Sequence, residues 1–515
     1  MTPTSRHDLS IIASALLNEV VLLPHPQGGP QVGLWFAPYH LLDDCHKLSL
    51  PYDSTFLPGP DVPPAAAQRR PSSPRDHASS STNASALLVS MGHVVTPYTS
   101  FLLDFGPLNI AQSVRLGHFI KQHISTLSQA PDLIVLICDQ ESQEDCSNAV
   151  VLLGAYVTLF HDAQWTAIDR YVNECMRSQP NGQLKLFRDP SYWTPPATFA
   201  NLSPRDCLAG LIHARDLGWF DLSTFSVQEY LFRDHPNQGD WNWVVPPPEA
   251  RRKTLATRQR LIQQGKLSPV KSTAAQVEDR CCGLLAFAGP DLAVPHQHPS
   301  IYVDPFKSQG ISTVVRLNNA NYDRAYFQHQ GFDHFDMIYP DGHNPPDVVL
   351  QQFLALVLRE YSRNGSIALH CMAGLGRTGT LICASMLAFA GFPGPMSAIG
   401  YLRLMRPGSV VGPQQVYLLE YLPQFHRIAR ELLMAAPPPS PIRLHSSVLG
   451  EKVMATLPTT NPFPLTMSET VAGAYETDQE PVLQPRKEAT SMGTYTARVV
   501  SPGTRLPPRT GSGTP

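Results

Sequence analysis

The chain contains 515 residues, of which 43% are apolar and 16% are charged, and its formal net charge is −3 at pH 7. This length exceeds what one hydrophobic core normally serves, so two domains are expected. The small negative charge excludes a global basic field that would draw the chain to nucleic acid or to an anionic membrane surface.

The nine cysteines are irregularly spaced and include no Cys-x-x-Cys pair. This pattern argues against a zinc site or a disulfide framework and fits a reduced, intracellular compartment. No stretch of uninterrupted apolar residues is long enough to predict a membrane-spanning helix. Residues 9–23 are apolar, but Asn18 and Glu19 interrupt them and no basic flank precedes them, so they are expected to form a buried element rather than a signal peptide.

Composition divides the chain into two globular blocks with polar segments between and after them. Residues 8–245 form the first block, apart from residues 58–86, which have no hydrophobic period and are predicted to be a disordered insertion. Residues 246–280 begin with three prolines and continue as a basic, polar linker. Residues 281–432 form the second block, and residues 433–515, rich in Pro, Ser and Thr, are predicted to be a disordered tail.

Each block contains an apolar strand that is followed by a cysteine, a loop and a helix. In the first block the strand is expected at residues 132–137 and the helix at 147–160. In the second block they are expected at 366–370 and 378–390, and the linker is expected to hold a short helix at 254–264. Alternating strands and helices predict two α/β domains with largely parallel sheets, and the repeated pattern suggests a duplicated fold.

The strongest chemical signal is the sequence His-Cys-Met-Ala-Gly-Leu-Gly-Arg-Thr-Gly from His370 to Gly379. It lies between a strand and a helix start, where successive backbone N–H groups and the helix N-terminus form a cradle for an anion. Glycines in the loop allow the backbone to approach a ligand closely. The residues expected to bind phosphate are Met372, Ala373, Gly374, Leu375, Gly376 and Arg377.

Three side chains of this motif predict phosphoryl transfer to cysteine. The field of the loop stabilises the thiolate of Cys371, which makes it a nucleophile. The planar guanidinium of Arg377 can hold two phosphoryl oxygens and meet the charge that develops in the transition state. The hydroxyl of Thr378 can stabilise the thiolate and assist the breakdown of the intermediate.

A cysteine nucleophile also needs a proton donor for the oxygen that leaves. The candidates are the four aspartates nearest before the motif: Asp333, Asp336, Asp341 and Asp347. Asp333 and Asp336 lie in a regular run that suits a strand. Asp341 lies in a Tyr-Pro-Asp-Gly turn, on a loop that can close over a substrate, and is the expected general acid.

Several further segments accompany the Cys371 loop in a fixed order: residues 104–109, 153–156, 239–243, 286–290, 315–318, 331–334 and 406–415. With these segments the chain resembles the cell-division-cycle fourteen family of dual-specificity protein phosphatases over residues 9–430. The loop alone would indicate only the wider superfamily of cysteine-dependent phosphatases.

The resemblance implies two phosphatase-like domains side by side, of which the first is inactive and recognises substrate. The residues agree, because Glu144 stands six positions after Cys138, where an active loop needs arginine. Acidic side chains around a phosphate cradle would repel a dianion. The resemblance also implies that Gln414 and Gln415 position the water that hydrolyses the cysteinyl-phosphate.

Two features depart from the family's pattern. Met372 stands where the family's loop usually has lysine, so the mouth of the site has less positive potential. The acidic run that receives basic residues after the phosphosite keeps Glu229 and Asp234 but places Leu231 and Arg233 between them. The preference for lysine or arginine after the phosphosite is therefore expected to be weaker.

The resemblance implies hydrolysis of phosphoserine and phosphothreonine before proline, and of phosphotyrosine, in opposition to cyclin-dependent kinases in cell-cycle or division control. It implies phosphoprotein partners, no nucleic acid, no metal or organic cofactor, and a location in nucleus, nucleolus and cytoplasm. Two alternatives remain open. A phosphoinositide or RNA-end phosphatase of the same fold is disfavoured by the neutral Met372 and Leu375, and a non-catalytic phosphopeptide-binding scaffold by the intact Cys371 and Arg377.

Overall fold

The computed structural model describes residues 21–23, 31–37, 49–53, 83–96, 98, 100, 104–126, 133–191, 201–269, 278–435, 486–489 and 495–498. The insertion predicted at 58–86 lies outside these residues up to residue 82. The predicted tail lies outside them after residue 435, except for two short strands, β11 (Arg486–Ala489) and β12 (Tyr495–Arg498), which pair antiparallel.

The first domain is built on a five-stranded sheet in the order β1-β2-β5-β4-β3. Its strands are β1 (Val21–Leu23), β2 (Gln31–Ala37), β3 (Ser49–Asp53), β4 (Asn83–Ser90) and β5 (Leu133–Asp139). β2 and β4 run parallel to the central β5, whereas both edge strands are antiparallel to their neighbours. The expectation of a largely parallel sheet is therefore wrong at these edges. Between β1 and β2 the connection is too short for the crossover that parallel strands need.

Six helices accompany this sheet: α2 (Met91–Val94), α3 (Ile110–Thr126), α4 (Gln143–His161), α5 (Trp165–Ser178), α6 (Pro204–Asp216) and α7 (Val227–Arg233). The predicted helix at 147–160 is confirmed as α4. It begins earlier than expected because the side chain of Ser142 accepts a hydrogen bond from the backbone N–H of Asp145 at 3.2 Å and caps the first turn. Every residue of α4 from Cys146 to Thr158 is buried, because the helix lies between β5 and α6.

The second domain repeats this plan in the strand order β6-β7-β10-β8-β9. Its strands are β6 (Trp241–Val245), β7 (Gly283–Phe287), β8 (Thr313–Arg316), β9 (Asp333–Asp336) and β10 (Ser366–His370). The strand predicted at 366–370 is confirmed as β10. All neighbours are parallel except β6, which pairs antiparallel with β7. Residues 241–245, placed in the first block by composition, thus belong to the second sheet, where the buried Trp241 packs near Phe306.

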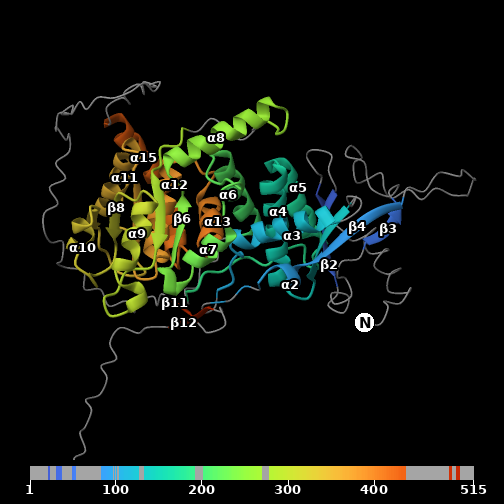
Figure 1. Ribbon diagram of the computed structural model, residues 1–515, viewed down its shortest axis with the longest axis horizontal. Coiled ribbons are helices and arrows are strands. Elements are labelled where there is room, and N and C mark those ends of the chain that lie inside the picture. Colours follow the sequence, from blue (N-terminus) through green and yellow to red (C-terminus); the bar gives the residue numbers. More distant parts are fainter. Residues whose placement is uncertain are drawn as a thin grey trace, which may run out of the picture.

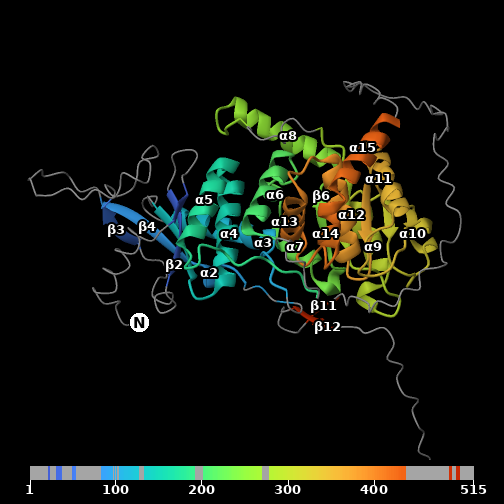
Figure 2. The same ribbon diagram turned by 180° about the vertical axis from the view of Figure 1, so that it is seen from behind.

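The helices that complete the second domain gather around its sheet (Figures 1 and 2). They are α9 (Ser300–Ser308), α10 (Ala325–His329), α11 (Asp347–Ser362), α12 (Gly376–Phe389), α13 (Pro395–Met405), α14 (Gln414–Glu420) and α15 (Leu422–Ala435), with short 3₁₀ turns at Pro236–Gln238 and Pro295–Gln297. The helix expected at 378–390 is confirmed as α12, and α12 is buried along almost its whole length. Among the described helices, none is long and apolar enough to cross a membrane.

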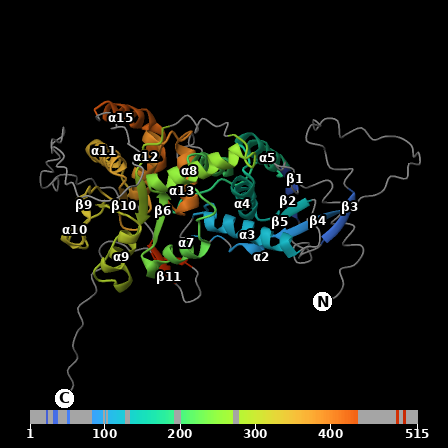
Figure 3. The same cartoon turned by 45° about the horizontal axis from the view of Figure 1, so that its top comes forward.

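The segment expected to be a linker contains a helix, α8 (Pro248–Gln263), which lies along both domains (Figure 3). At one end Arg258 donates a hydrogen bond to the carboxylate of Asp162 in the first domain at 2.5 Å. At the other end Arg252 donates to the side chain of Asn364 in the second domain at 2.8 Å. The short helix expected at 254–264 is therefore part of a longer helix that ties the two domains together.

The two domains also pack directly, through α6 and α13. A Cβ atom at Gly210 of α6 would lie 2.1 Å from the carbonyl oxygen of Ser397, so only glycine allows these helices to approach so closely. Beside this contact, His213 Nε2 lies 2.8 Å from the carbonyl oxygen of Ala390. One cluster of buried apolar residues runs through both domains, so the first domain is fixed against the second by a continuous core.

Candidate active site

The Cys371 loop joins β10, the central strand of the second sheet, to α12. Cys371 is buried, and it lies at the carboxyl end of a strand that is parallel to both of its neighbours. α12 begins after Leu375, whose apolar side chain cannot cap the helix. No side chain therefore caps the first N–H groups of α12, and their binding of an anion stays a prediction.

Backbone geometry turns this loop into a cradle. Gly374 has a φ of 66°, and a Cβ atom there would lie 2.0 Å from the carbonyl oxygen of Phe287, so glycine is required. Arg406 donates hydrogen bonds to the carbonyl oxygens of Ala373 and Gly374, at 3.0 and 2.8 Å. In a trans peptide the N–H points away from the carbonyl. The N–H groups that follow these two carbonyls therefore point to the opposite side, into the loop.

The cradle depends on Arg406, to which the sequence analysis gave no role. The Arg406 side chain is completely buried, and its remaining donors reach Asp240 at 3.0 Å and Asn242 at 2.6 Å. A buried guanidinium needs such partners because an unpaired charge away from water is costly. The signal was present in the sequence, since Asp240, Asn242 and Arg406 lie in two segments that carry the resemblance, but only the fold brings those segments together.

Arg377 lies at the centre of the site. Its Nη1 donates to the backbone carbonyls of Leu317 and Tyr339, at 3.1 and 2.8 Å. Its Nη2 lies 3.1 Å from Oδ1 of Asp341. Its Nε is buried and has no hydrogen-bond partner among the described residues. A buried donor left open in this way, at the start of α12, fits the oxygen of a bound phosphoryl group.

The pKa of Asp341 is shifted in the direction that favours a general acid. Burial raises the pKa of its carboxyl group above the ordinary value, and the cation of Arg377 opposes this only in part. A raised pKa keeps the proton on the carboxyl group to higher pH, where it can be given to a leaving oxygen. Half-buried on the loop after β9, Asp341 is therefore well placed for the role that the sequence predicts.

The other three candidate aspartates have structural partners. Asp333 and Asp336 belong to β9, as expected, and they pair with Arg359 at 3.0 Å and Arg316 at 2.7 Å. Asp347 begins α11 and accepts a hydrogen bond from the hydroxyl of Tyr421 at 2.5 Å. Of the four, Asp341 is the one that pairs with Arg377.

The two predicted glutamines are both buried but lie in different surroundings. Gln414 accepts a hydrogen bond from the N–H of Val411 at 3.1 Å and donates to the carbonyl of His343, on the loop of Asp341, at 3.1 Å. Gln415 instead donates to the carboxylate of Asp189, in the first domain, at 2.6 Å. Gln414 is thus next to the acid loop, whereas Gln415 lies at the contact between the domains.

Four further predicted residues lie around this centre. Thr378 is buried in the first turn of α12, and its hydroxyl has no partner among the described residues, while Met372 is half-buried. On α7, Glu229 is exposed but paired with Arg233 at 2.8 Å, and Asp234 is buried at the end of the helix. The roles of Glu229 and Asp234 in recognising substrate stay predictions. Within the described part of the chain, no group of His, Cys, Asp and Glu side chains is arranged to hold a metal ion.

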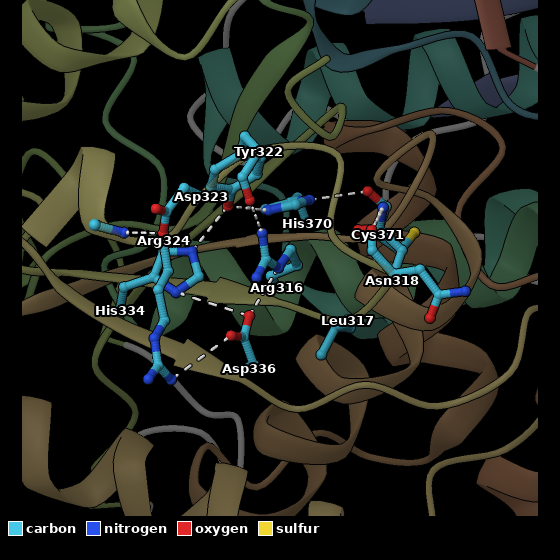
Figure 4. A network of polar contacts seen from close by, with 12 residues as sticks. Arg316, Leu317, Asn318, Tyr322, Asp323, Arg324, His334, Asp336, His370 and Cys371 are labelled. Carbon is cyan, nitrogen blue, oxygen red and sulfur yellow. Dashed lines mark hydrogen bonds and ion pairs between the residues drawn. The ribbon is translucent and has the colours of Figure 1, made fainter. Parts of the chain in front are cut away.

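A buried polar network supports the strand that carries Cys371 (Figure 4). The hydroxyl of Tyr322 lies 2.9 Å from Nε2 of His334 and 2.8 Å from Nε2 of His370, whose Nδ1 lies 2.9 Å from the carbonyl oxygen of Cys371. Because that carbonyl can only accept, Nδ1 of His370 carries the proton. Nε2 of His370 then accepts from the Tyr322 hydroxyl, which in turn accepts from Nε2–H of His334. Burial lowers the pKa values of His334 and His370 to about 4 and about 3, so both rings are neutral near pH 7.

The corresponding segment of the first domain differs from the Cys371 loop. Cys138 lies near the end of β5 rather than after the strand, and the first turn of α4 is capped by the side chain of Ser142. Burial raises the pKa of the Cys138 thiol well above its ordinary value, and Cys146 and Asp145 add to the effect. Glu144, which stands where arginine would be needed, pairs with Lys185 at the surface. These features agree with the expectation that the first domain is not catalytic.

Comparisons with known proteins agree with this arrangement. Residues 75–214 match the family described as dual specificity protein phosphatase, N-terminal half, and residues 302–391 match a family of DSP-PTPase phosphatases of polymorphic toxin systems. Over 63% of its length the chain is 32% identical to the tyrosine-protein phosphatase cdc-14 of Caenorhabditis elegans, covering 40% of that protein. It is 33% identical to the dual specificity protein phosphatase CDC14AB of Danio rerio and 32% identical to CDC14A of Homo sapiens, covering 46% and 48% of them.

These matches and the two similar sheets show a dual-specificity phosphatase fold in two copies, of which the second contains the Cys371 loop. Within that class, the curated relatives to which the chain is similar are CDC14 phosphatases. It spans about half the length of the curated relatives that it matches.

Substitution of Arg406 tests whether its bonds shape the cradle. Arg406→Lys keeps the charge but cannot make the same forked set of bonds to Ala373 and Gly374. We expect binding of inorganic phosphate or tungstate, measured by calorimetry, to weaken about tenfold or more, because buried acceptors lose their donor. The matched control is Arg427→Lys, on an exposed residue paired with Glu431. Unchanged anion binding in Arg406→Lys would contradict the role of this residue.

The neutral histidines predict a loss of stability in acid. In the unfolded chain their pKa is the ordinary 6.5, so below that pH the unfolded state binds more protons than the folded state. The free energy of unfolding is therefore highest above pH 6.5 and decreases as the pH falls. His334 alone should lower it by roughly 3 kcal/mol at about pH 4. The side chain of His334→Gln can still donate to Tyr322 but does not titrate. In this variant the free energy of unfolding, measured with urea from pH 7 to 4, should decrease less than in the wild type. His426→Gln, on an exposed residue, is the control; identical pH dependence in His334→Gln and wild type would refute the assignment.

Proposed function

We propose that this chain is a dual-specificity protein phosphatase that hydrolyses phosphoserine, phosphothreonine and phosphotyrosine through a cysteinyl-phosphate at Cys371. The observation that carries the proposal is the position of Arg377. Its guanidinium pairs with the expected acid at 3.1 Å and keeps one buried donor open at the start of α12. The contact of Arg377 with Asp341 supports the assignment of anion site and acid to one place, on the helix that follows the Cys371 loop.

In the first step, the phosphoryl oxygens bind the N–H groups of the loop and the guanidinium of Arg377. The thiolate of Cys371 attacks phosphorus, a P–S bond forms and the P–O bond to the substrate breaks. Asp341 gives its proton to the leaving oxygen, which departs as an alcohol or phenol. Arg377 and the loop N–H groups stabilise the charge of the transition state because they are already oriented for it.

In the second step, water attacks phosphorus and the P–S bond breaks. Asp341, now a carboxylate, accepts a proton from this water, and Cys371 leaves as the thiolate. Gln414 is the better candidate to position the water, because it lies against the acid loop through His343. Its amide oxygen and nitrogen each make one hydrogen bond within the protein, which leaves a second position on each for water.

The finer substrate preference follows from the family. We infer that phosphoproteins with serine or threonine before proline are the substrates, that the chain opposes cyclin-dependent kinases in cell-cycle or division control, and that it acts in the nucleus, nucleolus and cytoplasm. The names of the relatives as dual specificity and tyrosine-protein phosphatases support the reaction class. Since Arg233 pairs with Glu229 and Asp234 is buried, we propose only a weak preference for basic residues after the phosphosite.

The nucleophile is tested by Cys371→Ser. We expect it to abolish turnover of an aryl phosphate and of phosphopeptides, because a serine hydroxyl is not ionised near neutral pH, while phosphopeptide binding remains measurable by calorimetry. The control is Cys383→Ser, which alters a buried cysteine of α12 outside the loop. Turnover retained in Cys371→Ser would refute the mechanism. If a phosphoinositide or an RNA 5′-phosphate is hydrolysed faster than phosphopeptides, phosphoproteins are not the substrate class.

The acid is tested by Asp341→Asn. We expect hydrolysis of phosphoserine peptides to slow by about a hundredfold or more, and that of an activated aryl phosphate to slow much less, because only the alkyl oxygen needs a proton to leave. The wild-type rate should fall on the alkaline side as Asp341 loses its proton. Its raised pKa places this limb at higher pH than an ordinary aspartate would. Asp333→Asn is the control, and the same profile in wild type and Asp341→Asn would rule Asp341 out.

A further inference from the structure

The contact between Asp189 and Gln415 joins the first domain to the catalytic loop region. Oδ2 of Asp189 accepts a hydrogen bond from Nε2 of Gln415 at 2.6 Å, and the two residues are 226 positions apart in sequence. Both side chains are almost completely buried, with exposed fractions of 6% and 2%. Away from water, the hydrogen bonds of a carboxylate are electrostatically stronger, so it holds its partners in place more firmly.

Asp189 is held firmly by its own domain. Its Oδ1 accepts a hydrogen bond from the N–H of Ser191 at 2.7 Å. The preceding residues pair with two other segments, because Arg188 exchanges backbone hydrogen bonds with Phe105 and Phe187 donates to Leu202. The position of Asp189 is therefore set by the fold of the first domain.

On the other side, Gln415 lies between opposite charges. Its amide oxygen accepts a hydrogen bond from Nη2 of Arg403 at 3.1 Å, while its amide nitrogen faces the carboxylate of Asp189. This arrangement fixes the orientation of the amide group, because the oxygen prefers the cation and the nitrogen prefers the anion. Gln415 thus links Asp189 to the buried guanidinium of Arg403.

Arg403 in turn holds the loop that precedes Gln414. It donates to the carbonyl oxygens of Ser409 and Val410, each at 2.9 Å. Val410 has a φ of 62°, which is strained for a β-branched residue and persists only where its surroundings enforce it. The N–H of Val410 also reaches the carbonyl of Leu375 in the phosphate loop at 3.3 Å.

We propose that Asp189 is a positioning residue for the hydrolysis of the cysteinyl-phosphate. It acts through Gln415 and Arg403 on the loop of Ser409 to Gly412, and so on Gln414, which Val411 and the acid loop hold in place. This inference rests on the proposed function, and it gives the first domain a part in the second chemical step, in addition to the expected recognition of substrate.

The first experiment separates the two chemical steps. In Asp189→Asn an amide nitrogen, which only donates, replaces one carboxylate oxygen. The side chain can then no longer accept hydrogen bonds through separate oxygens from both Ser191 and Gln415. If hydrolysis of the intermediate slows, kcat and KM for an aryl phosphate should fall together by about tenfold, with kcat/KM nearly unchanged. Stopped-flow mixing should then show a burst of the phenol equal to the enzyme concentration. A simple loss of folded protein would lower kcat/KM and give no such burst.

A double-mutant cycle tests the route of the effect. Asp189→Ala and Gln415→Ala should each slow hydrolysis of the intermediate, and the double variant should be no slower than the worse single variant, because both act through one contact. Asp169→Ala is the control, since Asp169 pairs with Arg205 within the same domain. If Asp189→Ala does not fold, the burst of Asp189→Asn decides the question alone.

The possible failures are distinguishable. If the wild type turns over normally but Asp189→Asn gives no burst, this inference is wrong and the proposed function stands. The same holds if the effects in the double-mutant cycle are fully additive. If the wild-type chain shows no turnover, or if its turnover does not depend on Cys371, the proposed function is wrong and this inference fails with it.

Discussion

The site depends on one geometric constraint. When the N–H groups of a loop point toward a bound anion, the carbonyl oxygens of the same peptides point away from it and need other hydrogen-bond donors. Arg406 receives two of these carbonyls, and it can be buried there because Asp240 and Asn242 accept its remaining donors. β6 brings Asn242 to this position, and Asp240 directly precedes the strand. The chemistry at Cys371 is thus supported from behind by a charged group that touches no substrate.

The two domains show how the same architecture can keep or lose such a site. Both have a central strand flanked by parallel neighbours and followed by a buried helix. In the second domain the strand ends at His370 and a loop separates it from α12, whereas in the first domain β5 runs through Cys138 and α4 starts soon afterwards. The first turn of α4 is capped by the side chain of Ser142 and carries Glu144 and Asp145, whereas the first turn of α12 has no side-chain cap and no acidic residue. The acidic side chains of α4 oppose the binding of an anion.

Contacts of buried charged groups tie the first domain to the second. Arg258 and Asp162 fasten α8, while Asp189, Gln415 and Arg403 continue the link to the loop before Gln414. These contacts connect the first domain to the loop before Gln414.

The sequence by itself determined the two α/β domains, the strand and helix around Cys371, the phosphate loop and the turn of Asp341, because these features are local and follow from hydrophobic period, glycine placement and spacing. It also indicated the inactive first domain through Glu144. The fold alone shows that residues 241–245 join the second sheet, that a helix of the linker bridges the two domains, and that Arg406, Asp189 and Arg403 make buried contacts with the loops around Cys371 and Gln414. These contacts join residues far apart in the chain, and their energies arise from burial of paired charges that no local pattern records.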